Sequence, residues 1–452
     1  MSGVSVGQAR GPGRAQVELA SFDGGVRGAH EVMRLDRYRH LQALGAHQPR
    51  VVRGGGYSYA AASFGGGAIV QDFCSFDRIL ALDETIGILE CEAGATLGRV
   101  FEVCEPRGWY LPVQAGYPGI TIGGCIAADV HGKNQLRDGT FSRQVESLTL
   151  FHPRHGFVAA SAQENAALFK STCGGLGLTG HIVSARLRLT RLPGATAQVC
   201  RRRLECIEDL LPVLEEAAAR ATFVYTWQNF TVRGRGFGRG YLYEGDFVLG
   251  TTRTSDFRCT AIDSTSRERY VVQALNGLTT STFNLAYEAL QGMSGACVEI
   301  GLFQLLFPVA HKVAYFRLFG RKGFHECQLL IPRQEFPRVA VRLREYLATN
   351  PVPVTLASAK LFHGERTTLR FDGSGVCLAL DFPRGAAGTR FAIWLDGLAR
   401  DVGALPNLIK DSRLGPETVR ACYPEYDAVR NALHRHDPER LYRSELSERL
   451  GL

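Results

Sequence analysis

Short apolar runs separated by clusters of glycine fill the chain from residue 50 to residue 191. Such runs, bounded by turn residues, are typical of β-strands, and the amphipathic stretches between them are typical of helices. We therefore expect strands at residues 50–52, 68–72, 87–91, 147–151 and 181–189. We expect helices at residues 30–44, 96–107 and 164–170. This part of the chain is predicted to be an α+β unit.

The pattern changes at Leu192-Pro193-Gly194, where proline and glycine together mark a turn. Beyond this point, long amphipathic stretches alternate with aromatic-rich apolar runs. They predict helices at 207–220 and 338–348 and strands at 221–230 and 327–331. Beyond residue 400 the chain becomes polar and helical, with helices expected at 415–432 and 438–449. Because 452 residues exceed one ordinary core, we predict a second α+β unit after the turn.

The composition is that of a soluble globular protein, with 45% hydrophobic and 21% charged residues. The net charge of +8 comes mostly from isolated arginines, without a basic run or a basic-aromatic repeat. We therefore do not expect nucleic-acid binding, whereas a mild attraction to anionic lipid or to a phosphate-bearing substrate fits the charge. No apolar stretch is long enough to cross a bilayer, so at most peripheral membrane contact is expected.

The twelve cysteines include no Cys-x-x-Cys pair, which excludes zinc ribbons and dithiol redox motifs. The first residues, 1–14, contain no apolar segment of the kind found in a secretory signal. We therefore expect a cytoplasmic protein, peripheral at the inner face of the membrane if it contacts one, with reduced and mostly buried thiols. No metal site is expected.

Three consecutive glycines follow the first strand expected after residue 50, in the sequence Arg53-Gly-Gly-Gly-Tyr-Ser58. Consecutive glycines expose backbone N–H groups that can bind an anion such as phosphate, although the same sequence also fits a mobile surface turn. The spacing matches neither the phosphate-binding loop of nucleoside triphosphatases nor the dinucleotide fingerprint.

The stretch Gly116–Asn134 (GYPGITIGGCIAADVHGKN) brings together small residues at Gly123, Gly124, Ala127 and Ala128. They leave about two helical turns without side-chain bulk, and a large planar ligand can lie against such a surface. The alternative is a tightly packed helix start followed by an exposed His-Gly-Lys turn.

Two further motifs lie later in the chain. Residues 173–180 (CGGLGLTG) contain four glycines and are expected to form a loop that packs its backbone closely against another group. Residues 410–413 (KDSR) form a charged tetrad, and such tetrads are usually solvated loops.

Three glycine loops in this order resemble the FAD-binding domain of the vanillyl-alcohol-oxidase (PCMH-type) flavoenzymes. Within that superfamily, IGGCIAADVHGKN, GGLGLTG and the C-terminal LIKDSR…YPEYD…DP are similar to the oxidase-subunit family of decaprenylphosphoryl-β-D-ribose 2′-epimerases. The similarity runs from about Arg50 to Leu192 and again from Asp381 onward. It implies an FAD-binding domain of two α/β subdomains, formed by residues 1–192 and 401–452. It also implies an inserted α+β substrate-binding domain at residues 193–400.

The resemblance also implies which residues line FAD. They are Arg53, Gly54, Gly55, Gly56, Tyr57, Ser58, Tyr59, Gly116, Thr121, Gly123, Gly124, Ala127, Ala128, His131, Gly177, Ile182 and Lys410. Many relatives bond the flavin covalently through a histidine of the first glycine loop, and this chain has Tyr57 at that position. Non-covalent FAD is therefore expected.

For catalysis, the resemblance implies Lys410, His131 and Lys133. A cation at Lys410 beside the flavin stabilises the anionic reduced form and can also bind the sugar hydroxyl. Lys133, Gln328 and Lys410 are implied on the substrate side. Hydride is expected to pass from a ribose carbon to flavin N5, while the hydroxyl proton leaves to a base that the sequence does not identify.

The chain departs from the family pattern on the substrate side. A family cysteine falls at Ala379, with Cys377 two residues earlier on the same strand face. An acidic loop residue falls at Ala310, and a glutamine falls at Glu326. These differences affect the inference of a lipid-linked sugar more than the inference of a flavin.

Three functions remain open on the sequence. The first, which we favour, is oxidation of a polyprenyl-phosphate-linked pentose at ribose C2, as the first half of an epimerisation to arabinose in cell-wall polysaccharide biosynthesis. A separate NAD(P)H-dependent reductase would complete it. The second is FAD-dependent alcohol or aldonolactone oxidation of a free, soluble sugar. The third is an inactive flavin-fold scaffold, which the intact His131, Lys133 and Lys410 disfavour.

Overall fold

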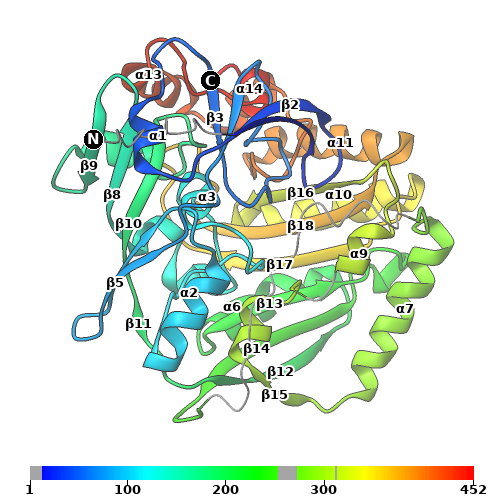
Figure 1. The fold of residues 1–452 in the computed structure, drawn as a ribbon. Coiled ribbons are helices and arrows are strands. Elements are labelled where there is room, and N and C mark those ends of the chain that lie inside the picture. The colour runs from blue at the N-terminus through cyan, green and yellow to red at the C-terminus, as the bar shows by residue number, and fades with distance from the viewer. Residues whose placement is uncertain (1–12, 253–271, 311–312) are drawn as a thin grey trace, which may run out of the picture.

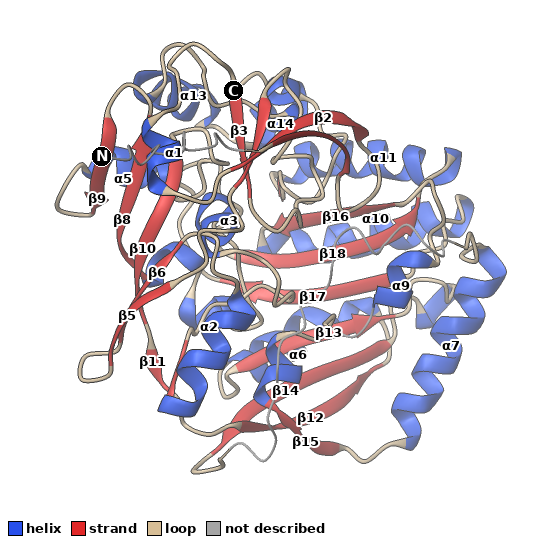
Figure 2. Cartoon of the chain, in the orientation of Figure 1, coloured by secondary structure: helices blue, strands red, loops and turns tan. Residues whose placement is uncertain are grey.

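A computed structural model of the chain describes residues 13–252, 272–310 and 313–452, and shows an α+β protein (Figures 1 and 2). Two smaller sheets are built from residues before 190, and one large sheet is built from residues after 195. The change from one set of sheets to the other coincides with the turn signal at Leu192-Pro193-Gly194.

The two smaller sheets hold the strands that the apolar runs predict. The first has the order β1 (Arg14–Ala20), β2 (Arg27–Arg34), β4 (Ile69–Asp72) and β3 (Arg50–Arg53). The second has the order β5 (Ile79–Asp83), β6 (Ile88–Glu92), β10 (His181–Arg188), β8 (Val145–His152) and β9 (Gly156–Ser161). A short pair, β7 (Trp109–Tyr110) and β11 (Thr190–Arg191), links this region to the chain that follows.

The large sheet has eight strands, and its central strands are long and antiparallel (Figure 2). Its order is β15 (Cys297–Gly301), β12 (Thr196–Leu204), β14 (Gly240–Val248), β13 (Phe223–Gln228), β17 (Leu356–Phe362), β18 (Gly375–Pro383), β16 (Phe324–Ile331) and β19 (Leu405–Pro406). Strand β18 lies between β16 and β17, so residues nearly 60 positions apart become neighbours on one sheet face.

Helices cover one face of this sheet. In α10 (Phe336–Thr349) the buried residues recur every three or four positions, which gives the helix one apolar stripe. Helix α11 (Ala386–Val402) packs beside it, and its Phe391 ring lies 5.0 Å from the Phe382 ring of β18. Each large apolar side chain buried here contributes about 1.5–3 kcal/mol to folding. These helices leave the opposite face of the same strands uncovered.

The remaining helices are shorter or lie at the edges of the sheets. They are α1 (Tyr38–Gln42), α2 (Leu97–Cys104), α3 (Ile122–Ala128), α4 (Gln135–Asp138), α5 (Ala166–Thr172), α6 (Leu210–Ala218), α7 (Gly277–Met293), α8 (Leu302–Leu306), α9 (Val313–Arg317), α12 (Pro416–Cys422), α13 (Tyr426–His436) and α14 (Glu445–Leu450). Along the described parts of the chain, none of the helices is both long and apolar enough to span a bilayer.

The C-terminal segment packs back onto the first sheet, as Figure 1 shows by the closeness of α14 and β3. The backbone N–H of Arg50 donates to Leu441, and the N–H of Arg443 donates to Arg50, so the segment extends the edge of β3. The N–H of Tyr59 donates to Ile409, which brings the first glycine loop beside the 410–413 tetrad.

Several sequence expectations are wrong in detail. Residues 30–34 belong to strand β2, because pairing with β1 and β4 satisfies their backbone and overrides a helical pattern. The expected helix at 415–432 is broken into α12 and α13 at Pro424. Of the expected helix at 438–449, only α14 forms, because Tyr442 and its neighbours pair with β3.

The expectation that the thiols are reduced is also wrong for one pair. Cys200 of β12 and Cys297 of β15 are directly opposite each other in the antiparallel register and form a disulfide. The sequence separation of 97 gave no indication of this pairing. Most of the other described cysteines are buried and free.

Candidate active site

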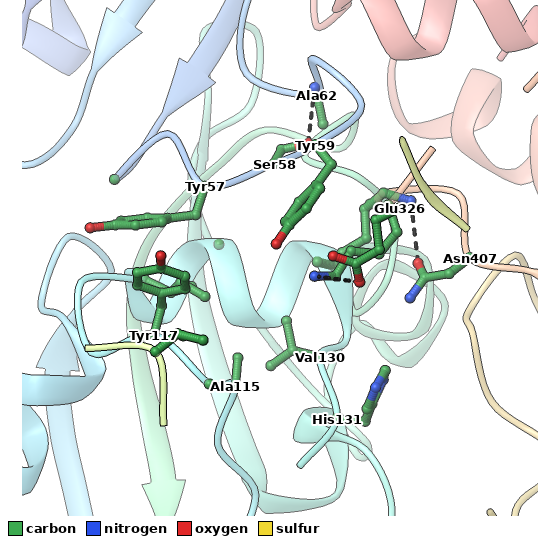
Figure 3. A pocket seen from close by; sticks show the side chains of 18 of the residues that line it. Tyr57, Ser58, Tyr59, Ala62, Ala115, Tyr117, Val130, His131, Glu326 and Asn407 are labelled. Carbon is green, nitrogen blue, oxygen red and sulfur yellow. Dashed lines mark hydrogen bonds and ion pairs between the residues drawn. The ribbon is translucent and has the colours of Figure 1, made fainter. Parts of the chain in front are cut away.

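A cavity of about 830 Å³ lies between the glycine loops of the N-terminal region and the open face of the large sheet (Figure 3). This volume is in the range of cofactor and ligand sites. Most of the lining comes from residues within 52–63, 115–131, 176–182, 308–328, 355–381 and 407–410. Segments that are far apart in the sequence therefore meet in one cavity.

The first two glycine loops touch each other through their backbones. A Cβ on Gly55 would lie 2.5 Å from the carbonyl oxygen of Gly119, and one on Gly54 would lie 2.2 Å from Oγ1 of Thr121. A Cβ on Gly119 would meet the Tyr57 hydroxyl at 2.3 Å. These glycines are therefore needed for close approach between the loops, and not only for a flexible turn. Together they form one wall of the cavity.

Helix α3 continues this wall and follows from the predicted small-residue surface. Thr121 caps it, because its hydroxyl accepts from the N–H of Gly124 at 3.2 Å. Gly123 packs against Ala93, where a Cβ would come within 3.1 Å of the Ala93 Cβ. Ala127 and Ala128 line the cavity on the same side. The wall is smooth and apolar over about two turns, which suits a flat aromatic ring system.

The third glycine loop closes the cavity from another side. Leu176, Gly177, Gly180 and Ile182 line it. Gly177 has φ +79°, and a Cβ there would meet no atom within 4 Å. The loop therefore borders open space inside the cavity, so the residues present leave room for a large planar cofactor.

Aromatic side chains stand at one end of the glycine wall. The rings of Tyr57 and Tyr117 lie 5.1 Å apart, and Figure 3 shows them one above the other. The Tyr59 ring lies next to Glu326. Burial and the neighbouring Glu326 carboxylate raise the pKa of Tyr59 well above its ordinary value, so its hydroxyl stays neutral.

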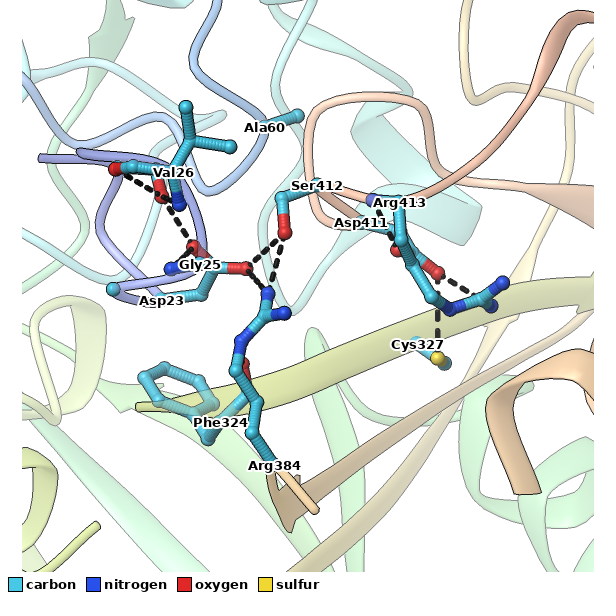
Figure 4. A network of polar contacts seen from close by, with 12 residues as sticks. Asp23, Gly25, Val26, Ala60, Phe324, Cys327, Arg384, Asp411, Ser412 and Arg413 are labelled. Carbon is cyan, nitrogen blue, oxygen red and sulfur yellow. Dashed lines mark hydrogen bonds and ion pairs between the residues drawn. The ribbon is translucent and has the colours of Figure 1, made fainter. Parts of the chain in front are cut away.

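Lys410 stands where the glycine wall meets the large sheet. Its ammonium lies 3.8 Å from the centre of the Tyr59 ring and forms an ion pair of 3.1 Å with Glu326. The other residues of the tetrad hold the loop in place (Figure 4). Ser412 donates to Asp23, and Arg413 forms a bidentate pair with Asp396. The tetrad is thus a fixed loop that presents one cation to the cavity.

His131 lies at the end of the small-residue stretch and borders the cavity. Its ring is 4.8 Å from that of Phe362. Burial lowers the pKa of His131 well below its ordinary value, and the nearby ammonium groups of Lys360 and Lys410 lower it further. The imidazole is therefore neutral at neutral pH.

The open face of the large sheet presents side chains at every second position to the cavity. They are Glu326 and Gln328 of β16, Cys377, Ala379 and Asp381 of β18, and Leu356, Ser358 and Lys360 of β17. The register places Asp381 directly between Glu326 and Leu356, and Ala379 directly between Gln328 and Ser358. Small, polar and charged groups thus form a second wall, opposite in character to the glycine wall.

A hydrogen-bonded chain runs along this second wall. Asn407 donates to Oε1 of Gln328 at 2.8 Å, and Nε2 of Gln328 donates to Oε1 of Glu326 at 2.5 Å. The Tyr315 hydroxyl lies 3.3 Å from Oδ2 of Asp381. Burial and the Glu326 carboxylate raise the pKa of Asp381 well above its ordinary value, which favours its neutral, protonated form.

Most of the residues carried over by resemblance line this cavity, but three do not. Arg53 donates to Ser63 and lies over the Phe64 ring, outside the lining. Lys133 donates to the carbonyl of Leu305 and lies 5.1 Å from the centre of the Tyr225 ring. Ala310 is buried outside the lining, whereas Ala379 and Glu326 belong to it.

The sequence reasoning missed several lining residues, among them Asp381, Lys360, Tyr315 and Asn407. Lys360 carried a usable signal, because a lysine inside the apolar run Leu356–Phe362 is rarely buried without a function. Tyr315 and Asn407 carried no such signal.

Comparison with known proteins agrees with this arrangement. Residues 41–158 match the family described as FAD binding domain. The chain is 27% identical over 423 residues to decaprenylphosphoryl-beta-D-ribose oxidase of Mycolicibacterium smegmatis, an alignment that covers 89% of each chain. It is 30% identical over 142 residues to cytokinin dehydrogenase 2 of Arabidopsis thaliana, 31% of this chain and 28% of that protein. It is 24% identical over 297 residues to Delta(24)-sterol reductase of Rattus norvegicus, covering 65% and 49%.

The domain match and these relatives make the chain an FAD-dependent oxidoreductase, and the expected FAD cofactor is confirmed. Over most of its length it resembles decaprenylphosphoryl-β-D-ribose oxidase. That resemblance agrees with the one carried by the HGKN and KDSR motifs.

Proposed function

We propose that the protein oxidises a hydroxyl group of a pentose carried on a polyprenyl phosphate, at ribose C2. A separate NAD(P)H-dependent reductase would then convert the ketone to an arabinose. The position of Lys410, between the smooth glycine wall and the polar sheet wall, supports this proposal most strongly. Residues 1–192 and 401–452 act in it as the FAD-binding domain, and residues 193–400 as the inserted substrate domain.

The two walls suggest a division of labour. FAD, when bound, supplies the hydride acceptor. The glycine loops and α3 would hold its flat ring system, and Lys410 would hold a negative charge next to it. Tyr57 replaces the histidine that bonds the flavin in many relatives, and a phenol packed against Gly119 gives no reason for a covalent bond. The FAD is therefore proposed to be non-covalent.

The polar wall is suited to sugar hydroxyls. Oδ1 of Asp381 is buried and has no hydrogen-bond partner within the described chain, although Asp381 borders the cavity. A neutral carboxylic acid can donate one hydrogen bond and accept another. We propose that Asp381 binds a sugar hydroxyl, with Gln328 and Ser358 beside it.

Oxidation of a CH–OH carbon to a ketone releases one hydride and one proton. We propose that Glu326 accepts that proton from the hydroxyl, because it is paired with Lys410 and has the neutral Asp381 opposite it. Lys410 would hold the hydroxyl oxygen while the proton leaves. His131, being neutral, would orient the sugar through hydrogen bonds.

The second candidate is oxidation of a free, soluble sugar or an aldonolactone. Glu326 and Ala379 favour it to some extent, because both differ from the family pattern and both line the cavity. Three apolar or aromatic residues that line part of the cavity, Phe283, Tyr287 and Leu318, favour a lipid-linked substrate.

Anaerobic reduction of the bound flavin distinguishes these candidates. Purified protein should be yellow, and acid precipitation should release the flavin into the supernatant. Polyprenyl-phosphate pentoses are expected to bleach the flavin, whereas free pentoses and lactones are not. Bleaching only by the free sugars would refute the proposal.

Two variants refine this test. Lys410→Ala is expected to keep FAD bound and to lower the bleaching rate by about a hundredfold or more, in the range of lost electrostatic stabilisation. Lys322→Ala, which removes an exposed lysine elsewhere in the chain, is the control and should bleach like the unmodified protein. An unchanged rate in Lys410→Ala would remove Lys410 from the mechanism.

A further inference from the structure

Helix α7 (Gly277–Met293) has an inverted distribution of polar and apolar side chains. Its buried residues, Thr280, Asn284 and Glu288, are polar or charged. A surface helix of a soluble protein normally buries an apolar stripe and exposes charged residues. The inversion requires that the inward polar groups find partners in the protein. It also leaves an apolar face turned outward.

Two of the three inward polar residues, Asn284 and Glu288, have such partners. Asn284 donates to the carbonyl of Val354 at 3.1 Å, and Glu288 forms an ion pair of 2.8 Å with Arg239. The Tyr241 hydroxyl donates to the backbone carbonyl of Glu288 at 3.0 Å. These bonds fix the rotation of α7 about its own axis. The outward face is therefore a defined surface of the protein.

The outward face is apolar and carries no charge. It exposes the large side chains Leu278, Phe283, Leu285, Leu290 and Met293, and Met293 and Leu278 are 83% and 78% exposed. The buried Glu288 is the one charged residue in the sequence of α7. Seven of the thirteen exposed large apolar side chains in the described chain lie between residues 272 and 298. Apolar surface gathered in this way marks an interaction site.

This face continues into the cavity. Phe283 and Tyr287 of α7 line the cavity, and the Tyr287 ring lies 4.7 Å from that of Trp227, which also lines it. In Figure 1, α7 stands at the edge of the large sheet, beside the ends of its central strands. An apolar path therefore leads from the exposed face of α7 to the polar wall around Lys410.

We propose that the outward face of α7 docks on a lipid bilayer and that the polyprenyl tail of the substrate passes along this helix into the cavity. The passage of the tail rests on the proposed function, whereas the docking stands on the surface alone. A helix of 17 residues is about 25 Å long and fits flat in the interfacial layer, with its leucines reaching the acyl chains. Because the face has no charge, the contact is hydrophobic and withstands salt.

Vesicle binding tests the docking. The full-length holoenzyme is floated with vesicles of phosphatidylcholine and phosphatidylglycerol, at low salt and in 0.5 M NaCl, where the Debye length is about 4 Å. The test variant carries Leu278→Gln, Leu285→Gln and Leu290→Gln, since glutamine keeps a good helix propensity. The control variant carries three equally conservative changes at exposed apolar residues elsewhere, Leu80→Gln, Val341→Gln and Ile393→Gln. Flavin content and circular dichroism establish that both variants are folded.

The unmodified protein and the control are expected to bind vesicles at both salt concentrations. The α7 variant should partition at least about tenfold less, which corresponds to about 1.4 kcal/mol. No binding by the unmodified protein, or equal binding by the α7 variant, would overturn the proposal. If the unmodified protein does not bind vesicles but forms dimers, and the α7 variant is monomeric, this face is instead a contact between two copies of the chain.

The tail is tested separately by flavin bleaching. The α7 variant should bleach at the normal rate with a short-chain, water-soluble polyprenyl-phosphate pentose. It should bleach at least about tenfold more slowly with a long-chain substrate held in vesicles. Equal rates with both substrates would refute the passage along α7. A third outcome separates the two proposals. If no polyprenyl-phosphate pentose bleaches the unmodified protein, but the α7 changes still reduce its binding to vesicles, the proposed function is wrong and the docking is supported.

Discussion

At the scale of single residues, the polar wall depends on two carboxyl groups that face each other across β16 and β18. Glu326 is held by Lys410 and Gln328, whereas Asp381 has one oxygen near the Tyr315 hydroxyl and one without a partner in the described chain. Two adjacent carboxylates cannot both ionise at low cost, so the pair takes one charge, and the raised pKa of Asp381 assigns the proton to it. The ionised partner beside Lys410 is then the group able to accept a proton.

The change Glu326→Gln tests that assignment. We expect the flavin bleaching rate to fall by about a hundredfold or more, because general base catalysis contributes about 10²–10⁴-fold. Stopped-flow absorbance of the flavin measures this rate.

Asp381→Asn is the matched control for this prediction. An amide resembles the neutral acid, so this variant should keep most of the bleaching rate at saturating substrate and lose mainly substrate affinity. If Glu326→Gln bleaches at the normal rate, the proton goes to another group.

At the scale of elements, the sequence predicts where strands and helices lie along the chain better than it predicts which strands pair with each other. The apolar runs located β4, β6, β8 and β10, and the glycine loops and the small-residue helix were recognised as a cofactor wall. The sequence did not indicate that β18 lies between β16 and β17, because antiparallel register is set by packing over the whole sheet. Without that register, Glu326 and Asp381 appear unrelated, and the polar wall could not be predicted.

The contact between the first two glycine loops gives a prediction at this scale. Gly55→Ala places a methyl group 2.5 Å from the carbonyl oxygen of Gly119, and a backbone oxygen cannot move away cheaply. We expect the loops to separate, with a loss of about 1–3 kcal/mol in stability and of most bound FAD. The ratio of flavin to protein and the melting temperature measure both effects.

Gly45→Ala is the matched control, since a Cβ there meets no atom within 4 Å. It should bind FAD normally and melt within a few degrees of the unmodified protein. Full FAD occupancy in Gly55→Ala would show that close approach of these loops is not needed for the cofactor wall.

At the scale of the whole molecule, three distant segments meet in one network of polar contacts (Figure 4). Asp23 lies in the turn between β1 and β2, Arg384 follows β18, and Ser412 belongs to the tetrad that carries Lys410. Arg384 donates to Asp23 and to Ser412, each at 2.5 Å, and Ser412 donates to Asp23 at 2.6 Å. The sequence showed that the C-terminal segment resembles the flavoenzyme pattern. It did not show that a buried ion pair links the segments.

This ion pair is expected to couple the stability of the protein to the position of Lys410. The Asp23 side chain is almost fully buried, so Arg384→Ala leaves a carboxylate without its charged partner, at a cost of about 3–5 kcal/mol. Urea unfolding should show this loss. Arg14→Ala, which removes the exposed pair with Glu31, should cost less than about 1 kcal/mol.

A double variant that removes both charges distinguishes the effect of the Asp23–Arg384 ion pair from the effect of side-chain packing. Asp23→Asn combined with Arg384→Met removes both charges and keeps most of the volume, so it should recover a large part of the stability lost in Arg384→Ala. The bleaching rate should nevertheless stay reduced, because Ser412 has then lost the Arg384 donor and the charge of its acceptor, and the loop that carries Lys410 is held less firmly. Recovery of the full rate in the double variant would show that packing alone positions Lys410. A loss of stability below about 1 kcal/mol in Arg384→Ala would mean that other donors replace Arg384 at Asp23. Either of these results would show that the network only stabilises its own neighbourhood. The expected results, lower stability in the single variant and a reduced bleaching rate in the double variant, would show that the network links the folded C-terminal segment to the chemistry of the site.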